Sequence, residues 1–183
     1  MSALGDRSVD DEALGLVRAA FSHARAGEAA ELASLLDRGV PPDVCNEKGD
    51  SLLMLASYNG HVEATRVLLE RGADPELANG RGQTPLAGVA FKGDESMAAL
   101  LLDSRAAVDG CGPDGKTPLM FAAMFDRVEI IELLLCRGAD PERADASGAG
   151  ALALARGMGA SRALARLERA ALPAARGGVI SSP

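Results

Sequence analysis

The feature that most restricts the fold of this sequence is a repeat with a period of 33 residues. Five kinds of position recur at this interval, and glycine or leucine occupies each of them in nearly every copy. The recurring positions are Gly49, Gly82, Gly115 and Gly148; Leu53, Leu86, Leu119 and Leu152; Leu35, Leu68, Leu101, Leu134 and Leu167; Gly27, Gly60, Gly93 and Gly159, with Asp126 in the other copy; and Gly39, Gly72 and Gly138, with Arg105 in the other copy. Because five columns share one register, the chain is predicted to be a stack of similar units, each packed on its neighbours.

Each unit has the pattern of two short helices. The clearest copy, residues 115–140, reads GKTPLMFAAMFDRVEIIELLLCRGAD. Thr84 and Thr117 are predicted to cap the first helix of their units, and Pro85 and Pro118 occupy the first helical position, where the missing N–H is not needed. The chain is 48% apolar but only 3% aromatic, and its Leu- and Ala-rich composition favours closely packed helices. The predicted fold class is therefore all-α.

These motifs resemble those of the ankyrin repeat family over about residues 13–170. The motifs are GQTPL (82–86), GKTPL (115–119), NGHVEATRVLLERGADPE (59–76) and DRVEIIELLLCRGADPE (126–142). The resemblance implies a solenoid of stacked antiparallel helix pairs that are joined by β-turn or hairpin loops. About five repeats are expected, including degenerate caps at both ends.

The register predicts where the repeat domain begins and ends. Polar residues such as Ser34 and Arg166 replace leucine in the first and last units, as the exposed ends of a stack require. The predicted organisation is a disordered N-terminus (1–10), a repeat domain (11–170) and a flexible tail (171–183). Within the domain we expect an N-terminal capping pair (11–44), full repeats at 45–78, 79–111 and 112–144, and a C-terminal capping repeat (145–170).

The sequence departs from the family pattern in three ways. The histidine of the family's TPLH motif is absent, because its positions hold Met54, Ala87, Met120 and Ala153. Arg105 replaces a glycine that the family holds in a left-handed conformation, at an expected cost of about 1–2 kcal/mol. Asp126 replaces a second such glycine and should tolerate that conformation better.

The resemblance implies that partners bind in a concave groove lined by the first helices and by the tips of the β-turns. Tyr58, Phe91 and Met124 share one column in this region, with Phe125 beside it, and large apolar groups on an exposed face are typical of binding sites. We expect the centre of binding energy between Phe91 and Phe125. Alternatively, these side chains lie flat over the helix ends and close the turn. The predicted partner-binding residues are Lys48, Asp50, Tyr58, Asn59, Arg81, Gln83, Phe91, Lys92, Asp114, Lys116, Met124 and Phe125, with Glu47 beside them.

A second column is acidic and consists of Asp43, Glu76, Asp109 and Glu142. We call it the acidic ladder. Its members are either turn residues that bind local backbone groups or a stripe that attracts a basic partner. Adjacent members should lie on the order of 10 Å apart, roughly the diameter of a helix, whereas one metal ion needs ligands within about 2.6 Å. No metal or other cofactor is therefore expected.

Charge and cysteine content narrow the class of function. A net charge of −7 argues against nucleic-acid binding, which needs a basic face. No apolar run is long enough to span a membrane, and three cysteines without a CxxC pair suggest a reducing, cytoplasmic setting. We expect a monomeric, non-enzymatic module that binds an unidentified protein partner through the groove. The alternative is a regulatory or inhibitory accessory subunit of an enzyme or stress-response protein, contacted through the acidic ladder.

Overall fold

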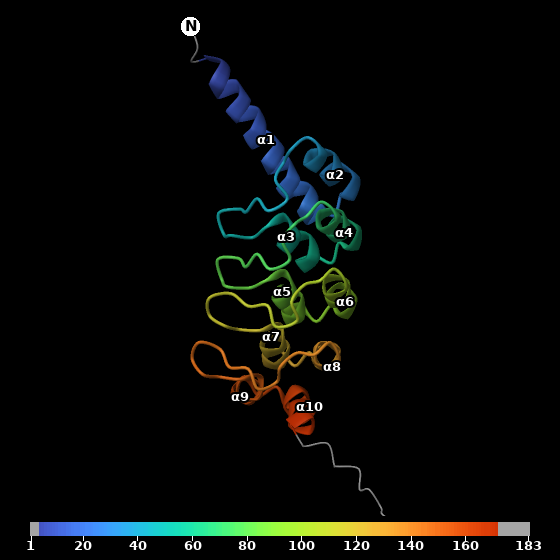
Figure 1. Ribbon diagram of the computed structural model, residues 1–183, viewed down its shortest axis with the longest axis vertical. Coiled ribbons are helices and arrows are strands. Elements are labelled where there is room, and N and C mark those ends of the chain that lie inside the picture. Colours follow the sequence, from blue (N-terminus) through green and yellow to red (C-terminus); the bar gives the residue numbers. More distant parts are fainter. Residues whose placement is uncertain (1–3, 172–183) are drawn as a thin grey trace, which may run out of the picture.

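The computed structural model describes the backbone of residues 4–171 and the side chains of residues 11–171, which form an elongated stack of helix pairs (Figure 1). The helices are α1 (Leu4–Ala26), α2 (Ala29–Asp37), α3 (Leu52–Tyr58), α4 (Val62–Glu70), α5 (Pro85–Lys92), α6 (Glu95–Asp103), α7 (Pro118–Met124), α8 (Val128–Cys136), α9 (Ala151–Met158) and α10 (Ser161–Ala171). The described residues contain no β-strand, only isolated bridges at two of the hairpin loops. The predicted all-α solenoid is confirmed.

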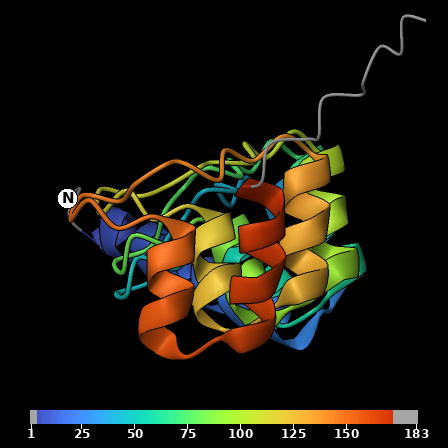
Figure 2. The ribbon, with the colours of Figure 1, turned by 90° about the horizontal axis from the view of Figure 1, so that it is seen from below.

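The helices form two layers. The odd-numbered helices, which we call the inner helices, pack on one another along the stack, and the even-numbered helices, which we call the outer helices, lie beside them on the side away from the loops (Figure 1). Hairpin loops at residues 45–51, 78–84, 111–117 and 144–150 lead into the inner helices α3, α5, α7 and α9 and project to one side (Figure 2). The periodic leucines lie in the core between the layers, where Leu68, Leu101 and Leu134 are fully buried.

Side-chain caps mark the starts of the inner helices α5 and α7 at the residues that the sequence predicts. The hydroxyls of Thr84 and Thr117 accept hydrogen bonds from the N–H groups of the third residue beyond them, and Ser51 has the same role before α3. Met54 and Met120 are buried at two of the positions where the family has histidine. Apolar packing therefore stands at these two positions in place of the family's side-chain hydrogen bond.

The ends of three inner helices are bound by the next repeat. Carbonyl groups near a helix C-terminus lack intrahelical partners. The carbonyl of Tyr58 accepts a bond from the Lys92 ammonium (2.7 Å), and that of Phe91 accepts one from Arg127 Nε (3.1 Å). The His61 ring lies 2.7 Å from a carbonyl of α1 in the same way. Successive repeats are thus linked by polar bonds as well as by apolar packing.

The first helix is longer than predicted. It begins at Leu4 rather than at Asp11, so residues 4–10, which were expected to be disordered, are helical. The segment contains no proline, and acidic residues such as Asp6 near its N-terminus favour helix formation through the helix dipole. Residues 1–3 and the tail 172–183 lie outside the described residues.

Arg105 and Asp126 both adopt the left-handed conformation of the glycines that they replace, with φ values of 71° and 57°. Gly72 and Gly138 hold the position of Arg105 in the neighbouring repeats, and an added Cβ at either of them would meet no atom within 4 Å. The strain at Arg105 therefore comes from the backbone alone.

Asp126 has a compensating contact. Its carboxylate accepts a hydrogen bond of 2.7 Å from the N–H of Ala163, in the first turn of α10. At the equivalent Gly93, a Cβ would lie 2.8 Å from the side chain of Arg127. In the last repeat the position equivalent to Arg127 is held by Ala160, whose small side chain leaves room for Asp126.

Candidate functional site: the groove face

The surface between the inner helices and the hairpin loops is here called the groove face. Six of the twelve predicted partner-binding residues meet in one hollow of about 360 Å³ on this face. They are Asp50, Tyr58, Asn59, Arg81, Gln83 and Phe91. We call this hollow the central hollow.

An aromatic row follows the groove face beside the central hollow. The ring centroids of Tyr58 and Phe91 are 6.4 Å apart with the planes 23° from parallel, and those of Phe91 and Phe125 are 4.3 Å apart in an edge-to-face contact. Tyr58 is 37% exposed, whereas Phe91, Phe125 and Met124 are half-buried. The rings of Phe91 and Phe125 contact each other directly, so the most open part of the row is at Tyr58.

A cation lies over the exposed end of the row. The ammonium of Lys92 is 4.9 Å from the centroid of the Tyr58 ring, within the range of a cation–π interaction. The same group donates to the Tyr58 carbonyl, so it is held in place over the ring. An incoming group at Tyr58 would meet both an aromatic surface and a positive charge.

Charges at the C-terminal part of the face are paired with each other. Lys116 Nζ lies 3.2 Å from the carboxylate of Asp114 and 3.5 Å from that of Asp145. Hydrogen bonding to Asp114 raises the pKa of Lys116. The Ser147 hydroxyl and the Ala149 N–H lower the pKa of Asp145 to about 2. The predicted residues Asp114 and Lys116 are half-buried, and their charges are paired within the stack.

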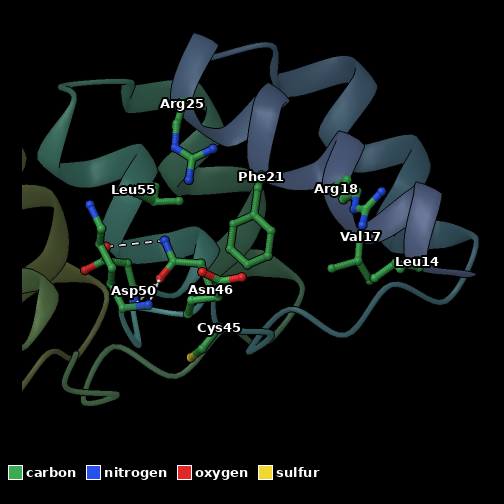
Figure 3. A pocket seen from close by; sticks show the side chains of 11 residues that line it. Leu14, Val17, Arg18, Phe21, Arg25, Cys45, Asn46, Asp50 and Leu55 are labelled. Carbon is green, nitrogen blue, oxygen red and sulfur yellow. Dashed lines mark hydrogen bonds between the residues drawn. The ribbon is translucent and has the colours of Figure 1, made fainter. Parts of the chain in front are cut away.

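A larger hollow of about 680 Å³ lies at the N-terminal end of the groove face, between α1 and the first hairpin loop (Figure 3). We call it the N-terminal hollow. Leu14, Val17 and Phe21 line it from α1, and Cys45, Asn46 and Lys48 line it from the hairpin. It has basic groups from α1 as well, Arg18 and Arg25.

The N-terminal hollow was not predicted, because Leu14, Val17 and Phe21 have the spacing of an ordinary packed helix face. The 33-residue register contains a signal for this hollow, because it shows that α1 begins earlier than the other inner helices. The later inner helices begin at Leu52, Pro85, Pro118 and Ala151, an interval that would start α1 at Ala19. The preceding part of α1, residues 4–18, therefore occupies the position of a hairpin loop and runs out on the same side as the loops (Figures 1 and 2).

The acidic ladder connects successive repeats. The carboxylate of Asp43 accepts a 2.7 Å bond from the N–H of Asp74, Glu76 accepts a 2.8 Å bond from that of Ala107, and Asp109 accepts a 3.1 Å bond from that of Asp140. These partners lie 31 residues away and not in the local turn. Glu142 stands at the last repeat and is exposed. The first three carboxylates therefore have a structural role between repeats.

Glu76 needs a small neighbour to fill this role. A Cβ added at Gly110 would lie 2.0 Å from the Glu76 carboxylate. At the equivalent position of the next repeat, 34 residues on, the shorter Asp43 and Asp109 have the larger Leu77 and Arg143. Burial raises the pKa of Glu76.

Comparison with known proteins agrees with the observed architecture. No helix within residues 4–171 combines the length and the apolarity needed to cross a membrane. A family model described as ankyrin repeats (3 copies) matches residues 16–109 and 68–145, which together make up more than half of the chain. A curated ankyrin repeat protein of Pseudomonas aeruginosa is 50% identical over 59 residues. That match covers 32% of this chain and 34% of the relative, so the chain spans about a third of the length of the curated relative that it matches. The 33-residue helix pairs, their caps and the matching family model establish that the chain belongs to the ankyrin repeat family.

Proposed function

We propose that this chain is a binding module that holds one protein partner against the groove face. Ankyrin repeats generally mediate protein–protein interaction. The observation that carries the proposal is the aromatic row, in which the exposed ring of Tyr58 borders the central hollow and continues into Phe91 and Phe125. Exposed aromatic side chains next to a hollow are typical of interface hot spots.

The alternative, an accessory subunit that is contacted through the acidic ladder, has less support. The carboxylates of Asp43, Glu76 and Asp109 already accept backbone N–H groups. A basic partner would have to compete with these bonds. Only the exposed Glu142 accepts no such bond from the described residues. We therefore favour the groove face.

Affinity capture with the full chain tests the proposal. The double variant Tyr58→Ala/Phe91→Ala removes the open part of the aromatic row, and we expect it to lose the captured partner while circular dichroism shows unchanged helical content. Val62→Ala is the matched control, because Val62 is exposed to a similar degree but lies on the outer helix α4. Partner capture that survives in the double variant contradicts the groove-face proposal.

A further inference from the structure

We infer that the N-terminal hollow binds an acidic segment of the partner protein and seats one of its apolar side chains against α1. This inference rests on the proposed function and names the chemistry of the ligand. The N-terminal hollow is larger than the central hollow and adjoins it, and the two share Arg25, Asp50 and Leu55. A single extended segment can therefore occupy both.

The charges around the two hollows favour an acidic ligand. Arg18, Arg25, Lys48, Arg81 and Lys92 lie at the hollows or over Tyr58. None of these five cations forms a salt bridge with another residue in the part of the chain whose side chains are described, residues 11–171. The carboxylates that line the same hollows are Glu47 and Asp50. The four lining cations and two lining carboxylates make a charge of +2 at the hollows, on a chain of net charge −7, and Lys92 adds a further positive charge over Tyr58.

One of the two carboxylates is already engaged. Asp50 accepts hydrogen bonds from the side-chain amides of Asn46 (3.3 Å) and Asn79 (2.9 Å). The Asp50 carboxylate is therefore already hydrogen-bonded within the hairpin loops. A ligand with carboxylates would instead pair with the five cations, and such complementarity decides which partner is accepted.

The wall formed by α1 supplies an apolar surface. Leu14 is 48% exposed, Val17 is half-buried, and Phe21 and Leu55 continue this surface toward the stack. In Figure 3 these side chains and Arg18 lie on the side of the helices, and Asn46 and Asp50 lie opposite them on the hairpin. The Arg25 guanidinium lies 5.9 Å from the centroid of the Phe21 ring, so charge and apolar surface are adjacent. A ligand with an aliphatic or aromatic side chain between two carboxylates matches this arrangement.

The test uses fluorescence anisotropy with three labelled 12-residue peptides and the full chain. One peptide alternates glutamate and leucine, the second replaces glutamate by lysine, and the third replaces leucine by serine. We expect the first to bind at least about tenfold more tightly than either of the others, and to weaken as salt rises. Equal or tighter binding of the lysine peptide would overturn the inference.

Alkylation of the cysteines locates the bound peptide. Cys45 lines the N-terminal hollow and is exposed, whereas Cys136 is exposed on the outer helix α8 and serves as an internal control. At a peptide concentration of about ten times Kd, iodoacetamide should modify Cys45 about tenfold more slowly and Cys136 at its original rate. Peptide binding that leaves the Cys45 rate unchanged places the ligand elsewhere and contradicts the inference.

Charge reversal separates this inference from the proposed function. Arg18→Glu/Arg25→Glu should weaken the acidic peptide at least about tenfold, whereas Arg66→Glu on the outer helix α4 should not. If the double reversal leaves peptide binding unchanged, the inference fails, while partner capture that still depends on Tyr58 and Phe91 leaves the proposed function standing. A wild-type dimer in analytical ultracentrifugation that the double reversal dissociates would show that a second copy is the occupant, which also overturns the inference.

Discussion

The hairpin loops of this stack are joined in two different ways. At the first junction, between loops 45–51 and 78–84, the N–H of Gly80 donates to the Lys48 carbonyl (3.0 Å), and the Asn79 amide donates to the Asp50 carboxylate (2.9 Å). The junction between loops 111–117 and 144–150, which we call the third junction, is similar. There the N–H of Ala146 donates to the Asp114 carbonyl (2.9 Å).

The middle junction, between loops 78–84 and 111–117, lacks both connections. The residue equivalent to Gly80 and Ala146 is Pro113, which has no N–H, and the residue equivalent to Asn79 is Gly112, which has no side chain. Without these bonds the middle loops still approach each other as closely as the first pair: a Cβ at Gly112 would lie 2.4 Å from the Gly82 carbonyl oxygen, and one at Gly80 would lie 2.7 Å from the Lys48 carbonyl oxygen. The contact between these two repeats therefore depends on backbone packing, on the Glu76 bond, on the bond from Arg127 to the Phe91 carbonyl and on the contact between Phe91 and Phe125.

The comparison shows that equal repeat spacing does not produce equal coupling between repeats. In a stack, stability is approximately the sum of repeat terms and of terms for each interface. Four sets of substitutions test whether the middle junction differs from the others, in order of the expected change in the free energy of unfolding.

The largest effect is expected for Gly112→Ala. The new methyl group would collide with backbone atoms of Gly82, which cannot move as a flexible side chain would. We expect a loss of about 2–3 kcal/mol, typical of overpacking, measured by urea unfolding. Gly157→Ala is the control, because a Cβ there meets no atom within 4 Å, and in helix α9 it should stabilise the protein by about 0.5–1 kcal/mol. A neutral Gly112→Ala would show that the loops are not in close contact.

The acidic ladder is expected to have an intermediate effect. Each of Asp43→Ala, Glu76→Ala and Asp109→Ala removes a hydrogen bond from a charged group to the next repeat, and we expect a loss of about 1–2 kcal/mol. Glu142→Ala should change stability by less than about 0.5 kcal/mol, because it is exposed at the last repeat.

The Glu76 variant should also differ from the others in cooperativity. Because the described loops 78–84 and 111–117 form no hydrogen bond with each other, Glu76→Ala should broaden the urea transition, whereas Asp43→Ala should keep its slope. Identical slopes in the two variants would remove the distinction between the junctions.

A smaller gain is expected for Arg105→Gly, at the end of the helix pair that precedes the middle junction. Glycine relieves the left-handed strain, which costs about 1–2 kcal/mol, but loses more conformational entropy on folding, about 0.5–1 kcal/mol. The net expectation is a stabilisation of about 0.5–1 kcal/mol in thermal or urea unfolding. The reciprocal change Gly138→Arg introduces the same strain at the next repeat and should destabilise the protein. If Arg105→Gly destabilises, the arginine side chain contributes more than its backbone strain costs.

The smallest effect is expected for Pro113→Ala. Alanine supplies an N–H that can donate to the Arg81 carbonyl, as Gly80 does to Lys48. The larger entropy of the unfolded chain offsets this gain, so stability should change by less than about 0.5 kcal/mol. Hydrogen exchange provides the sensitive measurement, because the new amide should be protected to the same degree as that of Ala146. Rapid exchange at this amide would show that the middle loops are too far apart to bond.

The sequence alone determined the repeat architecture of this protein. A 33-residue register of glycines and leucines allows little other than stacked helix pairs, and Thr84 and Thr117 begin their helices as predicted, because capping is a local interaction. The register also identified Arg105 and Asp126 as replacements for left-handed glycines, and the structure shows that both residues keep that conformation.

Tertiary structure decided what these columns do in space. The bond from Asp126 to Ala163, the use of the acidic ladder between repeats and the contact of Phe91 with Phe125 all join residues that are at least 31 positions apart. Their geometry depends on how one repeat sits on the next, which no single repeat encodes. The N-terminal hollow is the clearest case: it exists because α1 continues where a hairpin loop would otherwise lie, so apolar side chains of α1 such as Leu14 and Val17 line an open surface.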